Sequence, residues 1–364
     1  MTAPRSLQVQ PDVTSYYHCM TRCVRRAFLM GSDASTGQRF DHRKRWVVEE
    51  LARLERVFAV DVCAYAVMSN HIHLVLRLDG EAGRRWSEEE LVARARTLFP
   101  GAVRLAEDAG VLAARLPEYR ERLTSLSWFM RCLNERIARR ANREDGCSGR
   151  FWEGRFKCRA LLDHGALLTC MTYVDLNPVH AGIARSLADS DFTSIQLRLA
   201  QHGRALHRDG AAPASPGEER VSCGDVGRHH TPALVPFSDE ASSPSHPDGG
   251  VESALPFERA AYVELVRFTG HAIRSDKPGS LSSTAAATVR AKGLSPERWG
   301  DALRDIATLR FAAIGERHLI HAFAHRCGRR RTSNAAWGGR AYEAQHALGT
   351  TSTSTVGAGY ACAA

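Results

Sequence analysis

Asn70-His71-Ile72-His73-Leu74-Val75-Leu76 is the stretch of this 364-residue sequence that decides the expected fold. From His71 to Leu78 the side chains of a strand would alternate between two faces. One face would carry Ile72, Leu74, Leu76 and Leu78, and the other His71, His73, Val75 and Arg77. An unbroken aliphatic face is typical of a strand that covers a hydrophobic core. We therefore predict a strand over 71–78 with its aliphatic face buried.

The opposite face of this strand carries two imidazoles, His71 and His73, which point the same way. Imidazole is the commonest metal-binding side chain, and two of them on one strand face form half of a site for a divalent ion. The alternative is that both are ordinary histidines on a polar sheet face. The His-x-His motif by itself does not choose between these interpretations.

Elements before the histidine strand predict a small α+β domain. We expect a strand over 16–24, an amphipathic helix over 41–58 and a second strand over 61–67. Met68-Ser69-Asn70 is then a short link into the histidine strand. Strand, helix, strand, link and strand is the beginning of an α+β sheet domain with packed helices.

The rest of the chain divides by composition. Helical periodicity marks 86–99, 117–141 and 163–176, the last ended by Pro178. Pro, Ser, Gly and Asp then dominate before periodicity returns. We expect a first domain over 13–200, a flexible linker over 205–256, a small, mostly helical C-terminal region over 257–345 and a disordered tail over 346–364.

Charge and hydropathy limit which partners and which cellular compartment we expect for the protein. The formal net charge is +9 and the pI about 9.2, which favours a polyanionic partner such as nucleic acid. No stretch reaches the roughly 20 apolar residues of a membrane span. Residues 1–11 lack the apolar segment of a signal peptide, so we expect a cytoplasmic protein with no membrane partner. Cys19 and Cys23 near His18 allow a zinc half-site, but the sequence has no Cys-x-x-Cys pair to complete it.

A basic and aromatic stretch over 150–159 is a candidate nucleic-acid surface. Rings that stack on bases, interleaved with cations that bind phosphates, suit single-stranded nucleic acid. The alternative is a solvated helix face beside core aromatics. The residues that we expect to contact nucleic acid are Arg150, Trp152, Arg155, Lys157 and Arg159.

Tyr173 and Asn177 are four residues apart and share a face of the helix that ends before Pro178. If that helix lay beside the histidine face, two imidazoles and an amide could hold a divalent cation, and the phenol could attack a phosphodiester as a covalent nucleophile. The alternative is that Tyr173 packs in the core and Asn177 caps the helix. The spacing leaves both readings open, because it does not place the helix on the strand.

Four blocks of the chain resemble, in order, the single-tyrosine (HUH) transposases. They are Tyr17-His18-Cys19, Tyr65-Ala66-Val67-Met68-Ser69-Asn70-His71-Ile72-His73, Gly149-Arg150-Phe151-Trp152-Glu153-Gly154-Arg155-Phe156 and Tyr173-Val174-Asp175-Leu176-Asn177-Pro178-Val179. The resemblance runs from about Val13 to Ile195 and is strongest to the REP-associated tyrosine transposases, related to the insertion-sequence 200/605 type. The sequence after about Phe257 lies outside it.

The resemblance implies both a fold and an activity. It implies a ferredoxin-like antiparallel sheet, Mg²⁺ or Mn²⁺ as cofactor, and cleavage and rejoining of single-stranded DNA, often with recognition of a hairpin. The family's nucleophile, which forms a 5′-phosphotyrosine, corresponds to Tyr173. Its histidine pair corresponds to His71 and His73, and its third metal ligand, a glutamine in some relatives, corresponds to Asn177. A homodimer is possible, in which Tyr173 would serve its own chain or its neighbour's.

Two other functions stay open on the sequence. A regulator that binds DNA hairpins without cleaving them would use the same basic stretch. A metal-dependent hydrolase would use the same histidines and release its product to water. The transposase expectation differs from both in requiring a covalent bond between Tyr173 and DNA.

Overall fold

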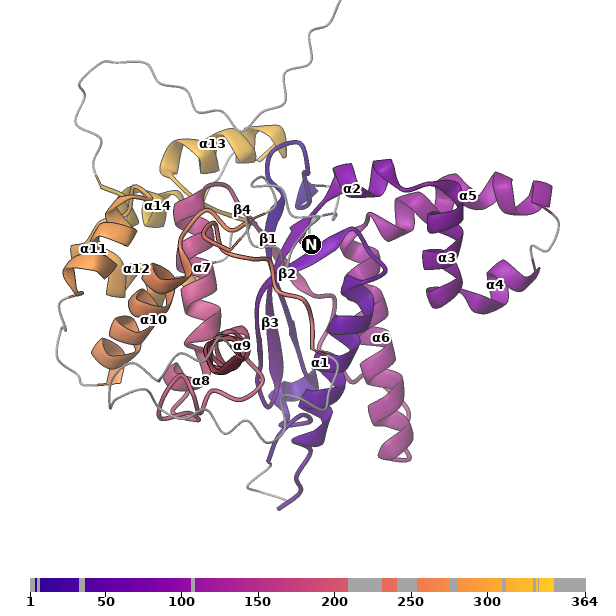
Figure 1. Cartoon of the computed structure of the whole chain (residues 1–364), viewed down its shortest axis with the longest axis horizontal. Coiled ribbons are helices and arrows are strands. Elements are labelled where there is room, and N and C mark those ends of the chain that lie inside the picture. Colours follow the sequence, from indigo (N-terminus) through magenta and orange to yellow (C-terminus); the bar gives the residue numbers. More distant parts are fainter. Residues whose placement is uncertain are drawn as a thin grey trace, which may run out of the picture.

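A five-stranded sheet forms the centre of the molecule (Figure 1). The computed structural model describes residues 4, 7–32, 37–105, 109–208, 231–240, 254–274, 281–309, 312–329, 332 and 334–343. The strands are β1 (Tyr16–Arg22), β2 (Val60–Val67), β3 (His71–Leu78), β4 (Lys157–Leu161) and β5 (Ala313–Ile314), in the spatial order β2-β3-β1-β4-β5. The predicted α+β class is therefore confirmed.

The first four strands have the ferredoxin-like arrangement. β3 lies antiparallel between β1 and β2, and β4 pairs antiparallel with the other edge of β1. β5 extends this sheet parallel to β4, with Ala160 opposite Ala313. The sequence analysis did not predict β5, because a strand of two residues has no alternation to detect.

Helices cover both faces of the sheet. Within the described residues they are α1 (His42–Glu55), α2 (Gly80–Arg85), α3 (Glu88–Leu98), α4 (Pro100–Leu105), α5 (Ala109–Leu123), α6 (Leu126–Glu144), α7 (His164–Asp175), α8 (Asn177–His180), α9 (Ser194–Arg208), α10 (Arg259–Arg274), α11 (Ser283–Arg290), α12 (Trp299–Ile306), α13 (Arg317–Arg326) and α14 (Ala335–Ala341), with short 3₁₀ turns η2 (Val24–Arg26) and η4 (Pro296–Arg298). No described helix is long and apolar enough to cross a membrane.

Alternation along β3 separates two cores. Ile72, Leu74 and Leu76 are fully buried in the core that includes α1 and α6. The histidine face lies toward α7 and α9, on the other side of the sheet in Figure 1. A bulge between Val62 and Ala64 shifts the register of β2 and places Cys63 in the second core. The predicted histidine strand and its buried aliphatic face are confirmed.

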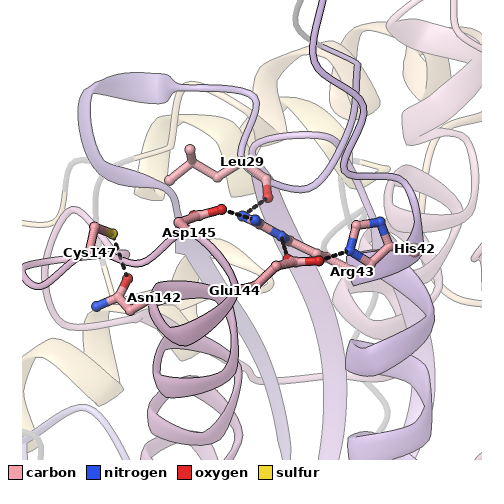
Figure 2. Close-up of polar contacts among 7 residues, drawn as sticks. All are labelled: Leu29, His42, Arg43, Asn142, Glu144, Asp145 and Cys147. Carbon is pink, nitrogen blue, oxygen red and sulfur yellow. Dashed lines mark hydrogen bonds and ion pairs between the residues drawn. The ribbon is translucent and has the colours of Figure 1, made fainter.

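Arg43 of α1 ties the first helical layer together (Figure 2). Its side chain is fully buried, and its Nε donates to Glu144 Oε2 at 2.7 Å at the end of α6. The same guanidinium donates to Asp145 and to the Leu29 carbonyl oxygen, and stacks on Phe40. One buried cation therefore fixes the end of α6 against α1 and against the loop after β1.

The C-terminal region packs on the first domain along the length of α7. At the end of α7, Asp175 is fully buried and accepts hydrogen bonds from Ser194, the Ile195 amide and Tyr262, the last at 2.5 Å from α10. At its start, Asp163 caps the helix and accepts from the Tyr342 hydroxyl and from the Glu316 amide. Both ends of α7 are thus bonded to residues after 250.

The predicted linker and tail fall largely outside the described residues. In the described segment 231–240, Leu234 bridges to Val62 of β2, and Val235 and Phe237 are buried. Residues 209–230, 241–253 and 344–364 are not described. The sequence also predicted one helix ending at Pro178. In the structure α7 ends at Asp175, Leu176 separates it from α8, and Pro178 lies in the first turn of α8. The first turn of a helix tolerates proline.

We expect Arg43→Ala to lower the free energy of unfolding by about 3 kcal/mol, because it removes the buried partner of two carboxylates. Arg139→Ala is the control, since Arg139 pairs with Glu135 on the exposed side of α6 and such a pair contributes less than about 1 kcal/mol. Urea unfolding followed by circular dichroism measures both. Equal losses in the two variants would contradict the role given to Arg43.

We expect Tyr262→Phe to lower the free energy of unfolding by about 1–3 kcal/mol, because a buried Asp175 oxygen loses its donor. Tyr119→Phe is the matched control: that hydroxyl is equally buried but has no hydrogen-bond partner among the described residues. Urea midpoints of the two variants test the link between α10 and α7. A loss in Tyr119→Phe as large as in Tyr262→Phe would argue against it.

Candidate active site

The two histidines of β3 begin the candidate site. His73 is buried at 3% exposure and His71, at the start of the strand, is half-buried. Their ring centroids are 4.9 Å apart with the rings nearly perpendicular. The strand thus presents two imidazoles side by side toward the helical layer of α7, as the alternation predicted.

Tyr173 lies on α7 and meets this histidine pair. Its ring centroid is 5.5 Å from that of His73, in an edge-to-face contact. A second such contact, 6.3 Å between centroids, joins it to His180 of α8. The structure therefore brings the predicted phenol and imidazoles together within one chain. The role of each group stays a prediction.

Asn177 connects the two halves of the site. It is the first residue of α8, is nearly buried, and its carboxamide is hydrogen-bonded to both the His71 ring and the Tyr173 phenol. The His71 ring also contacts Asn70, with Nδ1 and Oδ1 2.6 Å apart. Two asparagines therefore restrain the orientation of the His71 ring.

Burial sets the charge state of the site. Desolvation lowers the pKa of His71 to about 4 and holds the pKa of His73 well below its usual range, so both rings are neutral at pH 7. Neutral imidazole is the form that binds metal ions. Burial raises the pKa of Tyr173, while the Asn177 hydrogen bond and the nearby Arg159 and Arg22 act in the opposite direction.

The metal-binding atoms of the site suit a divalent cation that accepts both nitrogen and oxygen ligands. His71, His73 and Asn177 offer two imidazole nitrogens and one amide oxygen, all uncharged. Among the described residues, no three His, Cys, Asp or Glu side chains form a metal site. The set would thus leave coordination positions for water or phosphate oxygens. Imidazole ligands suit Mn²⁺ better than Mg²⁺, which prefers oxygen alone.

His18 of β1 is a site residue that the sequence analysis did not select. Its Nε2 lies 2.9 Å from His73 Nδ1, and the two rings stack with centroids 5.1 Å apart. The hydrogen bond leaves the far nitrogen of His73 to face the site and restrains the ring. Along β1, His18 alternates with Cys19 and therefore shares a face of the sheet with Met20. The pairing of Met20 with His73 was needed to place it.

The structure does not support the zinc half-site of Cys19, Cys23 and His18. Cys19 and Cys23 are fully buried in the core on the α1 side of the sheet, whereas His18 points to the α7 side. All three are therefore ordinary parts of β1 and its extension rather than one ligand set.

The predicted nucleic-acid contacts separate into exposed and packed residues. Arg150, Arg155 and Lys157 are exposed. Trp152 is only 8% exposed, and its indole nitrogen donates to the Asn134 carbonyl oxygen at 2.8 Å. Its ring is a core group here, with no open face on which a base could stack.

Arg159 is also committed within the fold. One of its terminal nitrogens donates to the Ile306 carbonyl oxygen at 3.1 Å and the other to that of Leu309. It lies opposite His18 in the sheet, so its charge still acts on the histidine cluster. To bind a phosphate as predicted, Arg159 would have to give up its hydrogen bonds to these two carbonyl oxygens.

Comparisons with known proteins give one distant likeness. No family model matches the sequence, and no curated protein sequence matches it. A solved structure of a REP-associated tyrosine transposase bound to a REP hairpin aligns with 62% of this chain and 98% of that chain, at 14% identity and a TM-score of 0.31. An alignment at that score assigns no role to any residue of this chain, so its function has to be argued from the site itself.

Proposed function

We propose that this protein is a metal-dependent DNA strand transferase of the single-tyrosine transposase type, which cleaves and rejoins single-stranded DNA through a 5′-phosphotyrosine at Tyr173. The observation that carries the proposal is the meeting of Tyr173, His73 and Asn177 on one face of the sheet, with ring centroids of Tyr173 and His73 5.5 Å apart. The phenol is a nucleophile that can form a covalent intermediate, and the two neutral imidazoles and the amide could hold a divalent cation.

In the proposed reaction, the Tyr173 oxygen bonds to the scissile phosphorus in line with the departing 3′ oxygen. The phenol gives up its proton, and the 3′ oxygen takes one up as it leaves. Because the tyrosyl ester keeps the energy of the phosphodiester, a second 3′-hydroxyl can reverse the step and rejoin a strand. No nucleotide is consumed.

His71, His73 and Asn177 would hold Mg²⁺ or Mn²⁺. When bound, this ion supplies Lewis-acid stabilisation of the phosphate charge. Asn177 also hydrogen-bonds the phenol and so orients the nucleophile. Since both ends of α7 are bonded to the C-terminal region of the same chain, we propose that Tyr173 serves its own chain rather than a dimer partner.

Tyr173→Phe should abolish a covalent protein–DNA adduct, because the attacking oxygen is removed. The assay incubates the protein with Mn²⁺ and a hairpin that carries single-stranded arms, and detects the adduct on a denaturing gel. Tyr16→Phe is the matched control, since Tyr16 lies on the same sheet face but at the far end of β1, opposite Arg77. An adduct that persists in Tyr173→Phe would refute the assignment of the nucleophile.

A DNA-binding regulator without cleavage activity is the second candidate, favoured by the exposed Arg150, Arg155 and Lys157, which pair with no acid among the described residues. Chelation of the metal by EDTA separates the two candidates. We expect hairpin binding to change less than about threefold in EDTA while adduct formation stops. A protein that binds the hairpin and forms no adduct in either condition would be a regulator.

His71→Ala/His73→Ala should weaken Mn²⁺ binding by at least about tenfold, because the proposed ion loses two of its three protein ligands, and a cooperative unfolding transition would show that the variant still folds. Titration calorimetry with Mn²⁺ and thermal unfolding give the two readouts. His42→Ala, a histidine that pairs with Glu144 far from the site, is the control. Unchanged Mn²⁺ affinity in the double variant would remove the metal from the mechanism.

A further inference from the structure

The loop that follows β1 has an unusual backbone. Arg25 and Arg26 of η2 have φ angles of 54° and 57°, in the left-handed region that favours glycine. Among the described residues, Phe192 is the other non-glycine residue with positive φ. Two successive arginines in this region carry a free-energy cost, so the surrounding structure must hold them there.

Hydrogen bonds fix this loop to the link before the histidine strand. The Cys23 amide donates to the Asn70 carbonyl oxygen at 2.8 Å, and the Met30 amide to that of Ser69 at 2.9 Å. At Gly31 a Cβ atom would lie 2.2 Å from Ser69 Oγ, so the loop is in close contact with the link. The strained segment is therefore held at both ends against residues 69–70.

One side chain joins the loop to the candidate site. The Asn70 side-chain nitrogen donates to the Arg26 carbonyl oxygen at 3.0 Å, and its Oδ1 lies 2.6 Å from His71 Nδ1. A displacement of the loop would thus displace the partner of a proposed metal ligand. The loop is a neighbour of the site and coupled to it.

The side chains of this loop are presented to solvent. Arg25 and Arg26 are exposed, and neither has an ion-pair partner among the described residues. Phe28 is 47% exposed, whereas most of the described large apolar side chains are buried. By contrast, the exposed arginines Arg131, Arg136 and Arg139 on α6 are ion-paired. Unpaired cations can bind the phosphates of a nucleic acid, and an exposed aromatic ring can stack on a base that is not paired.

The loop also adjoins the other unpaired cations. The Val24 amide donates to the Phe151 carbonyl oxygen at 2.9 Å, and the Glu153 amide donates to the Arg22 carbonyl oxygen at 2.8 Å. Exposed Arg150, Arg155 and Lys157 lie on that second segment. Both segments therefore lie beside the start of β3, since Arg22 is opposite His71 in the sheet.

Resting on the proposed function, we propose that residues 24–28 form a subsite for single-stranded DNA next to the catalytic site. Phe28 stacks on an unpaired base, and Arg25 and Arg26 bind the phosphates beside it. A base in a duplex is stacked on its neighbours and has no free face for Phe28, so the subsite selects single strands.

Binding of a 2-aminopurine oligonucleotide tests this subsite. The experiment uses Tyr173→Phe protein, which cannot cleave, and a hairpin whose single-stranded arm carries the fluorescent base. We expect Phe28→Ala to weaken binding about tenfold and to lose the fluorescence quenching, and Phe28→Trp to retain both. Arg25→Ala/Arg26→Ala should reduce the slope of log affinity against log salt by about 1.4, the contribution of two single-strand phosphate contacts.

Arg267→Ala/Phe268→Ala is the matched control. These neighbours on α10 are also an exposed arginine and an exposed phenylalanine (39%), and α10 packs on α8 and α11. Their replacement should change neither quenching nor salt slope. Equal losses in control and loop variants, or equal affinity of Phe28→Ala and the parent, would overturn the inference, as would tighter binding to the fully paired duplex.

The covalent adduct tests the proposed function, whereas binding by Phe28 tests the subsite, so either can fail without the other. If the protein with Tyr173 intact forms an adduct and Phe28→Ala binds DNA normally, the subsite is wrong and the function stands. If no adduct forms but quenching depends on Phe28, the subsite stands and belongs to a DNA-binding protein without strand transfer.

Discussion

The antiparallel pairing of β3 between β1 and β2 is the constraint on which the rest of the structure depends. That pairing fixes which face of β3 meets α1 and α6 and which meets α7. A slip of one residue would turn the imidazoles into the aliphatic core and the leucines toward Tyr173. The register is held because Ile72, Leu74 and Leu76 are fully buried on the first side. The geometry of the polar site is thus set by the burial of apolar side chains on the opposite face.

The C-terminal region completes this arrangement, although it lies outside the family resemblance. Its Tyr262 and Tyr342 bond the two acids at the ends of α7, and β5 extends the sheet beside β4. The Asp175 cluster is fully buried, so its carboxylate relies on those donors, and burial still raises its pKa. The helix that carries Tyr173 is therefore held by contacts both to the sheet and to residues more than 80 positions later in the chain. A helix held at both ends keeps its phenol beside the histidines of its own chain.

The distribution of paired and unpaired charge separates structural arginines from those open to a ligand. The buried Arg43 neutralises two carboxylates, and Arg131, Arg136 and Arg139 of α6 pair along their own helix or with α1. The exposed cations Arg25, Arg26, Arg150, Arg155 and Lys157 have no such ion-pair partners among the described residues. A net charge of +9 by itself says only that a polyanion is favoured. The unpaired cations beside the candidate site are where we propose that the polyanion binds.

The sequence by itself determined the strand of His71 and His73, its buried aliphatic side, the helix of Tyr173 and the four-residue spacing to Asn177. These are local properties, since alternation and helical periodicity are contained within one segment. Only the tertiary structure decided that His18 contacts His73, that Trp152 is buried, and that Arg159 bonds the segment after α12. It also decided that a two-residue strand from the C-terminal region joins the sheet. The physical reason is that register, burial and hydrogen-bond partners depend on which distant segments pack together, and no pattern within a single segment carries that information.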